Sequence, residues 1–201
     1  YLAMSLIVVF FAMVPFFMVF EGRKPQAREI MVIAVLAAIG VAGRAAFYMI
    51  PSFKPIAAIV ILTGVSFGGE AGFLVGCMIM MVSNMFFGQG PWTPWQMFSY
   101  GLIGFLAGIL FQKGILKARK IPLCIYGFLS VIFIFGGIMN PASILMSYGR
   151  ITWKSLIAFY ISGIPVDLVQ ATSTVFFLWI LSHPLLEKLE RIKKKYGLIE
   201  R

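Results

Sequence analysis

The chain has 201 residues, of which 61% are hydrophobic and only 12% are charged. A soluble domain usually has about 25% charged residues, so this chain has more apolar surface than a globular core can bury. Its net charge of +10 does not indicate a nucleic-acid groove, because the basic residues stand in short clusters between apolar runs. Composition therefore predicts an all-α integral membrane protein with one membrane domain, since no polar linker is long enough to separate two.

The first apolar run, residues 1–20, carries no charge and is long enough to span a bilayer. A cleaved signal peptide would need basic residues before this run and a small-residue cleavage site after it, whereas the sequence EGRKP follows. We therefore expect a retained membrane helix. The second span is predicted at 29–50, and the prolines of the sequence PSFKP at 51–55 predict a stiff turn after it.

The run from 56 to 88 is too long for one span and short for two. Its interruption by the sequence GGE at 68–70 predicts a hairpin of two short or tilted helices. Glycines and prolines predict a loop at 88–96. Further spans are expected at 96–112, 121–139 and 156–182, with a loop at 140–155.

The last segment, 184–201, is basic and amphipathic. Pro184 is expected to stop the preceding span, because proline lacks the backbone N–H that a helix interior requires. We expect a cytoplasmic tail helix that is attracted to anionic lipid, while a docking surface for a cytoplasmic partner is the alternative.

The basic residues predict the orientation of the seven spans. Alternate connections carry thirteen lysines and arginines on one side, against three on the other. The chain is therefore expected to begin outside the cell and to end in the cytoplasm. The thirteen are Arg23, Lys24, Arg28, Lys113, Lys117, Arg119, Lys120, Lys188, Arg191, Lys193, Lys194, Lys195 and Arg201, and the three are Lys54, Arg150 and Lys154.

Ionisable residues within spans are costly and indicate function. Glu70, at the break of the hairpin, is most simply the first-turn residue of the fourth span, where the helix dipole favours a negative charge. Arg44 and Asp167 fall at a similar depth in the outer halves of two spans. They are expected either to pair with each other or to line a cavity that opens to the outside. Cys77 and Cys124 lie in apolar runs and are expected to be buried free thiols.

Two further features of the sequence indicate surfaces that contact another helix or a ligand. Alanines at strict four-residue spacing, Ala34, Ala38, Ala42 and Ala46, form one stripe of the second span and allow close approach of another helix. Spacing alone favours packing within this chain over docking of a second subunit. Two tryptophans and two glutamines within 88–96, next to Asn84, favour an extracellular ligand mouth over a simple interfacial belt.

The chain shows no catalytic set, metal-ligand spacing or nucleotide-binding loop, so neither an enzyme nor a self-powered pump is indicated. We expect no cofactor and no metal. A stand-alone secondary transporter or channel would show inverted repeats and charged midplane residues, and no convincing repeat is present. It is retained as the alternative function.

Three stretches suggest a family: IMVIAVLAAIGVAGRAAFYMIPSFKP, GVSFGGEAGFLVG and SNMFFGQGPWTPWQM. Together they make residues 27–185 resemble the substrate-binding S components of energy-coupling factor (ECF) vitamin transporters. The sequence GQGPWTPWQM is similar to one branch of this family, often assigned to cobalamin. The resemblance implies a six-helix substrate-binding core at 27–185, with residues 1–20 as an additional helix and 186–201 as a basic cytoplasmic tail.

The resemblance also implies partners. S components of prokaryotic cell membranes capture a vitamin from outside and deliver it with a T subunit and two ATPase subunits, which hydrolyse the ATP. The alanine stripe of the family contacts the T subunit, which here implicates Ala34, Ala38 and Ala42. The family resemblance and the outward position of the polar residues together give eight expected ligand-binding residues: Arg44, Lys54, Asn84, Gln89, Trp92, Trp95, Gln96 and Asp167.

Overall fold

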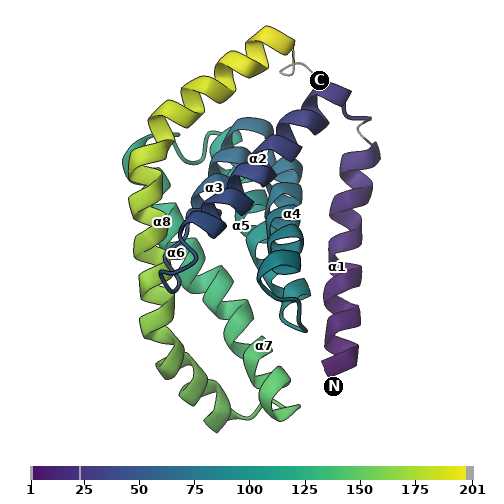
Figure 1. Cartoon of the computed structure of the whole chain (residues 1–201), viewed down its shortest axis with the longest axis vertical. Helices are drawn as coiled ribbons and strands as arrows, with labels where there is room; N and C mark the ends of the chain where they lie inside the picture. The colour runs from purple at the N-terminus through teal and green to yellow at the C-terminus, as the bar shows by residue number, and fades with distance from the viewer. Residues whose placement is uncertain (1, 23, 198–201) are drawn as a thin grey trace.

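The computed structural model describes residues 2–22 and 24–197 (Figure 1). Over these ranges the chain is built from α-helices and one π-helical turn, with no strand. The π-helical turn, η1, joins α6 and α7 into one continuous rod. The elements are α1 (Leu2–Gly22), α2 (Ala27–Ala46), α3 (Ile56–Phe67), α4 (Gly69–Phe87), α5 (Thr93–Gln112), α6 (Lys120–Ser130), η1 (Val131–Phe135), α7 (Gly136–Tyr148) and α8 (Trp153–Tyr196).

Helix lengths confirm an all-α membrane protein. Among the described residues, α2, α4, α5, the α6–α7 rod and α8 are long and apolar enough to cross a bilayer, while α1 and α3 contain shorter apolar stretches. The predicted hairpin is also confirmed, because α3 ends and α4 begins at Gly68, whose φ of 101° is left-handed and suits glycine. Glu70 lies in the first turn of α4, where it was expected.

The core is centred on α3, in which all residues but Val65 are buried. It packs between α4 and α5, and glycines let the backbones approach closely. A Cβ atom at Gly104 would lie 2.5 Å from the carbonyl oxygen of Gly72, and one at Gly64 would lie 2.2 Å from the carbonyl oxygen of Gly104. Small residues at helix contacts are the usual means of tight packing in lipid.

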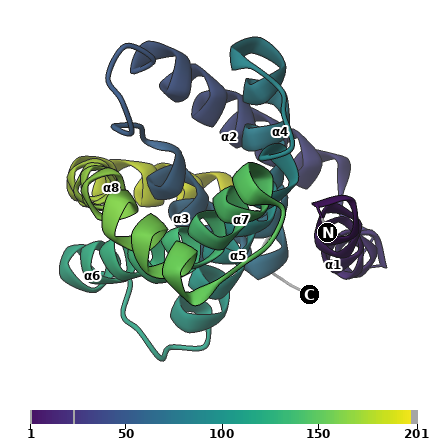
Figure 2. The ribbon, with the colours of Figure 1, turned by 90° about the horizontal axis from the view of Figure 1, so that it is seen from below.

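Helix α1 stands at the side of the bundle (Figure 2). It contacts α4 and α5, where the Phe16 ring stacks on Phe73 at 4.0 Å and meets Phe105 edge-on at 4.8 Å. Met13 and Val9 are buried at this contact, whereas Phe10, Phe11 and most other large side chains of α1 are exposed. In a membrane this outer face would meet lipid.

The loop expected at 140–155 is wrong, because α7 continues through Pro141 to Tyr148. A proline inside a helix leaves the carbonyl four residues earlier without its backbone donor. Here that carbonyl belongs to Gly137, and the Tyr160 hydroxyl of α8 donates to it at 3.3 Å. Only residues 149–152 separate α7 from α8.

The helix stop expected at Pro184 is also wrong. Helix α8 runs along one side of the bundle (Figure 1). It has 44 residues and contains both Pro165 and Pro184. Its final turns have tertiary contacts, since Leu189 is buried in the core and the Lys193 ammonium donates to the carbonyl oxygen of Ser66. These contacts explain why the helix persists beyond a residue that weakens it. The fifth span likewise starts at Thr93, inside the stretch expected to be a loop.

Candidate functional site

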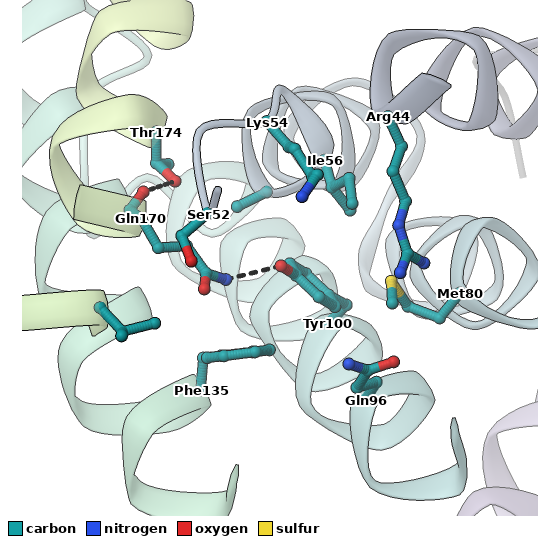
Figure 3. A pocket seen from close by; sticks show the side chains of 12 residues that line it. Arg44, Ser52, Lys54, Ile56, Met80, Gln96, Tyr100, Phe135, Gln170 and Thr174 are labelled. Carbon is teal, nitrogen blue, oxygen red and sulfur yellow. Dashed lines mark hydrogen bonds between the residues drawn. The ribbon is translucent and has the colours of Figure 1, made fainter. Parts of the chain in front are cut away.

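A cavity of about 230 Å³ lies where α2, α3, α4, α5, η1 and α8 meet, together with the connection from α2 to α3 (Figure 3). We call this end of the bundle the cavity end, and the opposite end, with most of the lysines and arginines, the basic end. Helix α1 contributes nothing to the cavity. The lining residues are Arg44, Ser52, Lys54, Ile56, Ala57, Met80, Gln96, Tyr100, Phe135, Val166, Gln170 and Thr174.

One wall combines a buried amide with two aromatic rings. The Gln170 amide nitrogen donates to the Tyr100 hydroxyl at 2.6 Å, a contact drawn in Figure 3. The Tyr100 ring lies 5.0 Å from the Phe135 ring. Phe135 ends the π-helical turn, a distortion that is frequent at functional sites and that shifts the side chains after it. The wall therefore offers apolar ring faces beside an amide carbonyl.

The opposite wall is built around Arg44, near the end of α2. Its guanidinium donates to Ser83 Oγ and to Asn84 Oδ1, both at 2.6 Å. It also lies 5.6 Å from the centre of the Phe87 ring. Arg44 therefore ties α2 to α4 while part of its side chain lines the cavity.

Asn84 is fully buried and links this wall to α5. Its amide nitrogen donates to Thr93 Oγ1 and to Gln96 Oε1, both at 2.9 Å. The Thr93 hydroxyl in turn donates to Gln89 Oε1 at 2.9 Å. This network fixes the connection between α4 and α5 and turns Gln96 toward the cavity.

Lys54 brings a second positive charge, from the connection between α2 and α3. Its carbonyl oxygen accepts a hydrogen bond from Ser173 of α8 at 3.2 Å. Burial lowers the pKa of the Lys54 ammonium, and the positive charge of Arg44 lowers this pKa further. Among the residues that the structure describes, the lining thus contains two basic side chains and no carboxylate.

Of the eight predicted binding residues, Arg44, Lys54 and Gln96 line the cavity, while Asn84 and Gln89 belong to the network behind it. The two tryptophans are elsewhere. Trp92 is 39% exposed, and its ring lies against the backbone of Gly90. Trp95 is partly buried, and its indole nitrogen has no hydrogen-bond partner.

Asp167 does not line the cavity, although its neighbour Val166 does. Its carboxylate accepts a hydrogen bond from the Asn140 amide of α7 at 3.1 Å. The described residues contain no ion pair between Asp167 and Arg44, so the expected pairing of these two charges is not found. Each instead meets a neutral amide.

Sequence reasoning missed Tyr100, Phe135 and Gln170. A signal existed for Gln170, because a glutamine within a span is costly unless it is partnered. Tyr100 and Phe135 gave no signal, since aromatic residues are common in this chain and a π-helical turn has no sequence signature here.

A separate apolar groove of about 570 Å³ runs between α2 and the end of α4. Ala34, Ala38 and Ala42 line it, and all three are exposed. The three alanines therefore lie open in a groove beside α4 and are not covered by another helix of this chain. Cys77 and Cys124 are buried free thiols, as predicted.

Comparison with known proteins gives one family and several relatives. The family model described as "ECF-type riboflavin transporter, S component" matches residues 24–191. A UPF0397 protein of Vibrio atlanticus (strain LGP32) is 30% identical over 125 residues, which cover 59% of this chain and 68% of the relative. A UPF0397 protein of Aliivibrio salmonicida (strain LFI1238) is 32% identical over 121 residues, covering 56% of this chain and 64% of the relative. A UPF0397 protein of Aliivibrio fischeri (strain MJ11) is 35% identical over 89 residues, or 42% of this chain and 48% of the relative. No solved structure matches the chain significantly.

Proposed function

Because this chain belongs to the family of S components of ECF-type riboflavin transporters, we propose that its cavity captures a vitamin or a related micronutrient. Membership in the family makes it a substrate-specific transport subunit rather than an enzyme. The ligand, the site residues and the direction of capture are our proposals. We also propose that residues 27–185 form the binding core, because the cavity receives no residue from α1.

The observation that carries this proposal is the meeting of polar side chains inside a membrane bundle. Arg44, Lys54, Gln96 and Gln170 converge on one space, although polar groups are costly in apolar surroundings. Gln96 uses its oxygen and Gln170 its nitrogen in hydrogen bonds within the chain. The Gln96 amide NH2, the Gln170 carbonyl and the Lys54 ammonium are the groups that a ligand would meet.

The lining favours a neutral or anionic ligand with a flat ring. Tyr100 and Phe135 offer ring faces, and the two glutamines offer one donor and one acceptor edge. Two basic residues and no carboxylate disfavour a cation. Riboflavin, which the family description names, has a neutral aromatic ring system with a carbonyl and N–H edge, and it is the first ligand to test.

The cavity volume can be compared with the size of cobalamin, the ligand that the tryptophan-rich sequence suggests by resemblance. Pockets for small molecules are usually about 300–1,000 Å³. At about 230 Å³ the cavity lies below this range, and a corrinoid macrocycle is far larger. The volume therefore supports a ligand of a few fused rings over cobalamin.

The exposed alanine stripe supports docking of a T subunit, which would connect this chain to two ATPase subunits. Methyl groups on one helix face let another helix approach closely. The orientation that fits capture from outside places the cavity end outward and the basic end in the cytoplasm, in agreement with the positive-inside rule.

The test begins with the purified chain alone in lipid nanodiscs. Isothermal titration with riboflavin, thiamine and hydroxocobalamin should give tight binding of riboflavin and weaker binding of the cationic and the macrocyclic vitamins. Mass spectrometry of small molecules retained on the protein checks the choice of ligands. Gln170→Leu should weaken binding, whereas Gln112→Leu, at the exposed basic end, should leave it unchanged.

Two results would contradict the proposal. If Gln170→Leu and Gln96→Leu both bind like the native chain, the cavity is not the ligand site. If the chain alone accumulates ligand in proteoliposomes, without a T subunit and ATPases, it is a stand-alone transporter.

A further inference from the structure

A second cavity, of about 480 Å³, opens at the basic end. It lies between the end of α3, the start of α6 and the later turns of α8, at the opposite end of the bundle from the cavity lined by Arg44. Its lining residues are Val65, Ser66, Phe111, Ala118, Arg119, Lys120, Leu123, Ser182, His183, Leu186, Glu187, Glu190 and Lys193.

Two buried hydroxyls in this cavity have no hydrogen-bond partner. Ser66 is 4% exposed and Ser182 is 2% exposed, and the side-chain oxygens of both are unpartnered. Helical serines and threonines commonly bond to the carbonyl one turn earlier, as Thr63 and Thr174 do in this chain. Because native proteins rarely leave a buried hydroxyl unpaired, these two oxygens indicate a ligand that accepts hydrogen bonds.

Basic side chains also line this cavity. Arg119 and Lys120 come from the start of α6, and Lys193 from α8. The Lys193 ammonium donates to the Ser66 carbonyl oxygen, so its charge is held beside one hydroxyl. An ammonium has three donors, so Lys193 has further N–H groups beside this bond, and the exposed Glu190 carboxylate acts on the same charge.

The carboxylates of the cavity stand at its rim. Glu187 has 56% of its side chain exposed and lies 3.8 Å from His183, and Glu190 is also exposed. The buried part of the lining therefore presents hydroxyl donors and a basic group without a carboxylate. This arrangement favours an anion with several acceptor oxygens, such as a phosphate.

We propose that this cavity binds the phosphate of an anionic phospholipid. A lipid is favoured over free phosphate because the cavity lies at the end of the membrane spans and is partly lined by Val65, Phe111 and Leu186. Large apolar side chains next to it, Ile121 and Trp179, are 65% and 53% exposed, as suits contact with acyl chains. Basic pockets between membrane helices are a recurrent type of lipid headgroup site.

The test is native mass spectrometry of the full chain released from nanodiscs that contain phosphatidylglycerol or phosphatidylcholine. We expect the native chain to retain phosphatidylglycerol and not phosphatidylcholine, because choline would bring a positive charge to the basic lining. The double variant Ser66→Ala/Ser182→Ala should lose at least about tenfold in phosphatidylglycerol affinity, because each hydroxyl donates to a charged oxygen. Lys193→Gln should lose a similar amount.

Matched variants separate the site from general charge and helix effects. Ser162→Ala changes an exposed serine of the same helix, and Lys188→Gln removes an exposed charge that does not line the cavity. Both should retain phosphatidylglycerol fully. The serine variants should fold, since they remove unpaired hydroxyls, and their melting temperature provides the check.

Three results would overturn the proposal. The first is equal retention of the two lipids, and the second is unchanged phosphatidylglycerol binding in folded Ser66→Ala/Ser182→Ala. The third is a rise in melting temperature with inorganic phosphate alone as large as the rise with phosphatidylglycerol, which would identify a free anion as the occupant. Riboflavin titration is independent of all three, so failure here leaves the proposed capture function standing.

Discussion

Helices α3 and α2 are neighbours with opposite surroundings. In α3 nearly every residue is buried, and glycines bring the backbones of α3, α4 and α5 into contact. In α2 only four residues are buried, Ile33, Leu36, Ala37 and Gly40, and the alanine stripe is open. Lipid tails are as apolar as leucine, so close packing rather than apolar burial decides which helices hold together. Helices α3–α5 therefore form a fixed frame, and α2 presents a surface.

The cavity lined by Arg44 and Lys54 lies on the seam between these two regions. Gln96 and Tyr100 come from the frame, while Arg44 and Lys54 come from α2 and the connection after it. The polar contacts of Arg44 with Ser83 and Asn84 cross this seam. Four experiments test whether frame, surface and seam are as distinct as the structure indicates.

The largest effect should come from the frame. Gly104→Leu should prevent folding, and Gly104→Ala should destabilise the chain by about 1–3 kcal/mol, because the new Cβ meets the Gly72 carbonyl. Gly137→Ala is the control, since a Cβ there meets nothing within 4 Å. Thermal unfolding in detergent measures all three. Equal melting temperatures for the two alanine variants would contradict a glycine-packed frame.

The surface of α2 should respond differently. Ala38→Leu fills the open groove with a bulky side chain, so it should abolish co-purification with the T subunit while ligand affinity and melting temperature stay unchanged. Ala158→Leu, at an exposed position of α8, should assemble normally. Normal co-purification of Ala38→Leu would remove the stripe from the docking surface.

At the seam, Arg44→Ala should weaken ligand binding by about 10- to 100-fold, because the charged hydrogen bonds of Arg44 to Ser83 and Asn84, which hold this wall of the cavity, are among the strong ones. Asp167→Asn should have a smaller effect, since Asp167 does not line the cavity. Arg150→Ala, in the exposed connection before α8, serves as the control for lost charge. Isothermal titration measures all three, and an Asp167 effect equal to that of Arg44 would extend the site beyond the cavity.

The smallest effect should be a pH dependence from Lys54. The pKa of the Lys54 ammonium lies below that of an ordinary lysine. At pH values between these two pKa values the unfolded chain binds more protons than the folded chain, so the free energy of unfolding rises with pH. Affinity for an anionic ligand should move the other way and fall as the ammonium loses its proton. Titrations from about pH 8 to pH 10.5 should show this fall. Lys54→Gln should remove this pH dependence of affinity, whereas Lys154→Gln should keep it. A pH dependence that persists in Lys54→Gln would show that another group causes it.

The membrane class, the hairpin at Gly68 and the polar group around Arg44 could be predicted, because charge and hydropathy act locally along the chain. The continuation of α7 through Pro141 and of α8 through Pro184 could not be predicted. Their continuation depends on Tyr160 donating to the carbonyl freed by Pro141, and on Leu189 and Lys193 holding the last turns of α8. These contacts join residues that only the fold brings together. The same holds for Phe135 and Tyr100, whose place in the cavity follows from helix packing and from the π-helical turn.

The unbroken course of α8 has a mechanical consequence. The same helix carries Gln170 in the cavity lined by Arg44 and Lys193 beside Ser66. These two residues are about 35 Å apart along the helix axis at 1.5 Å per residue. If α8 moves as a lever pivoting at the cavity, a tilt of about ten degrees carries Lys193 through about 6 Å. A small adjustment around a captured ligand would thus become a displacement large enough to break a hydrogen bond at the far end.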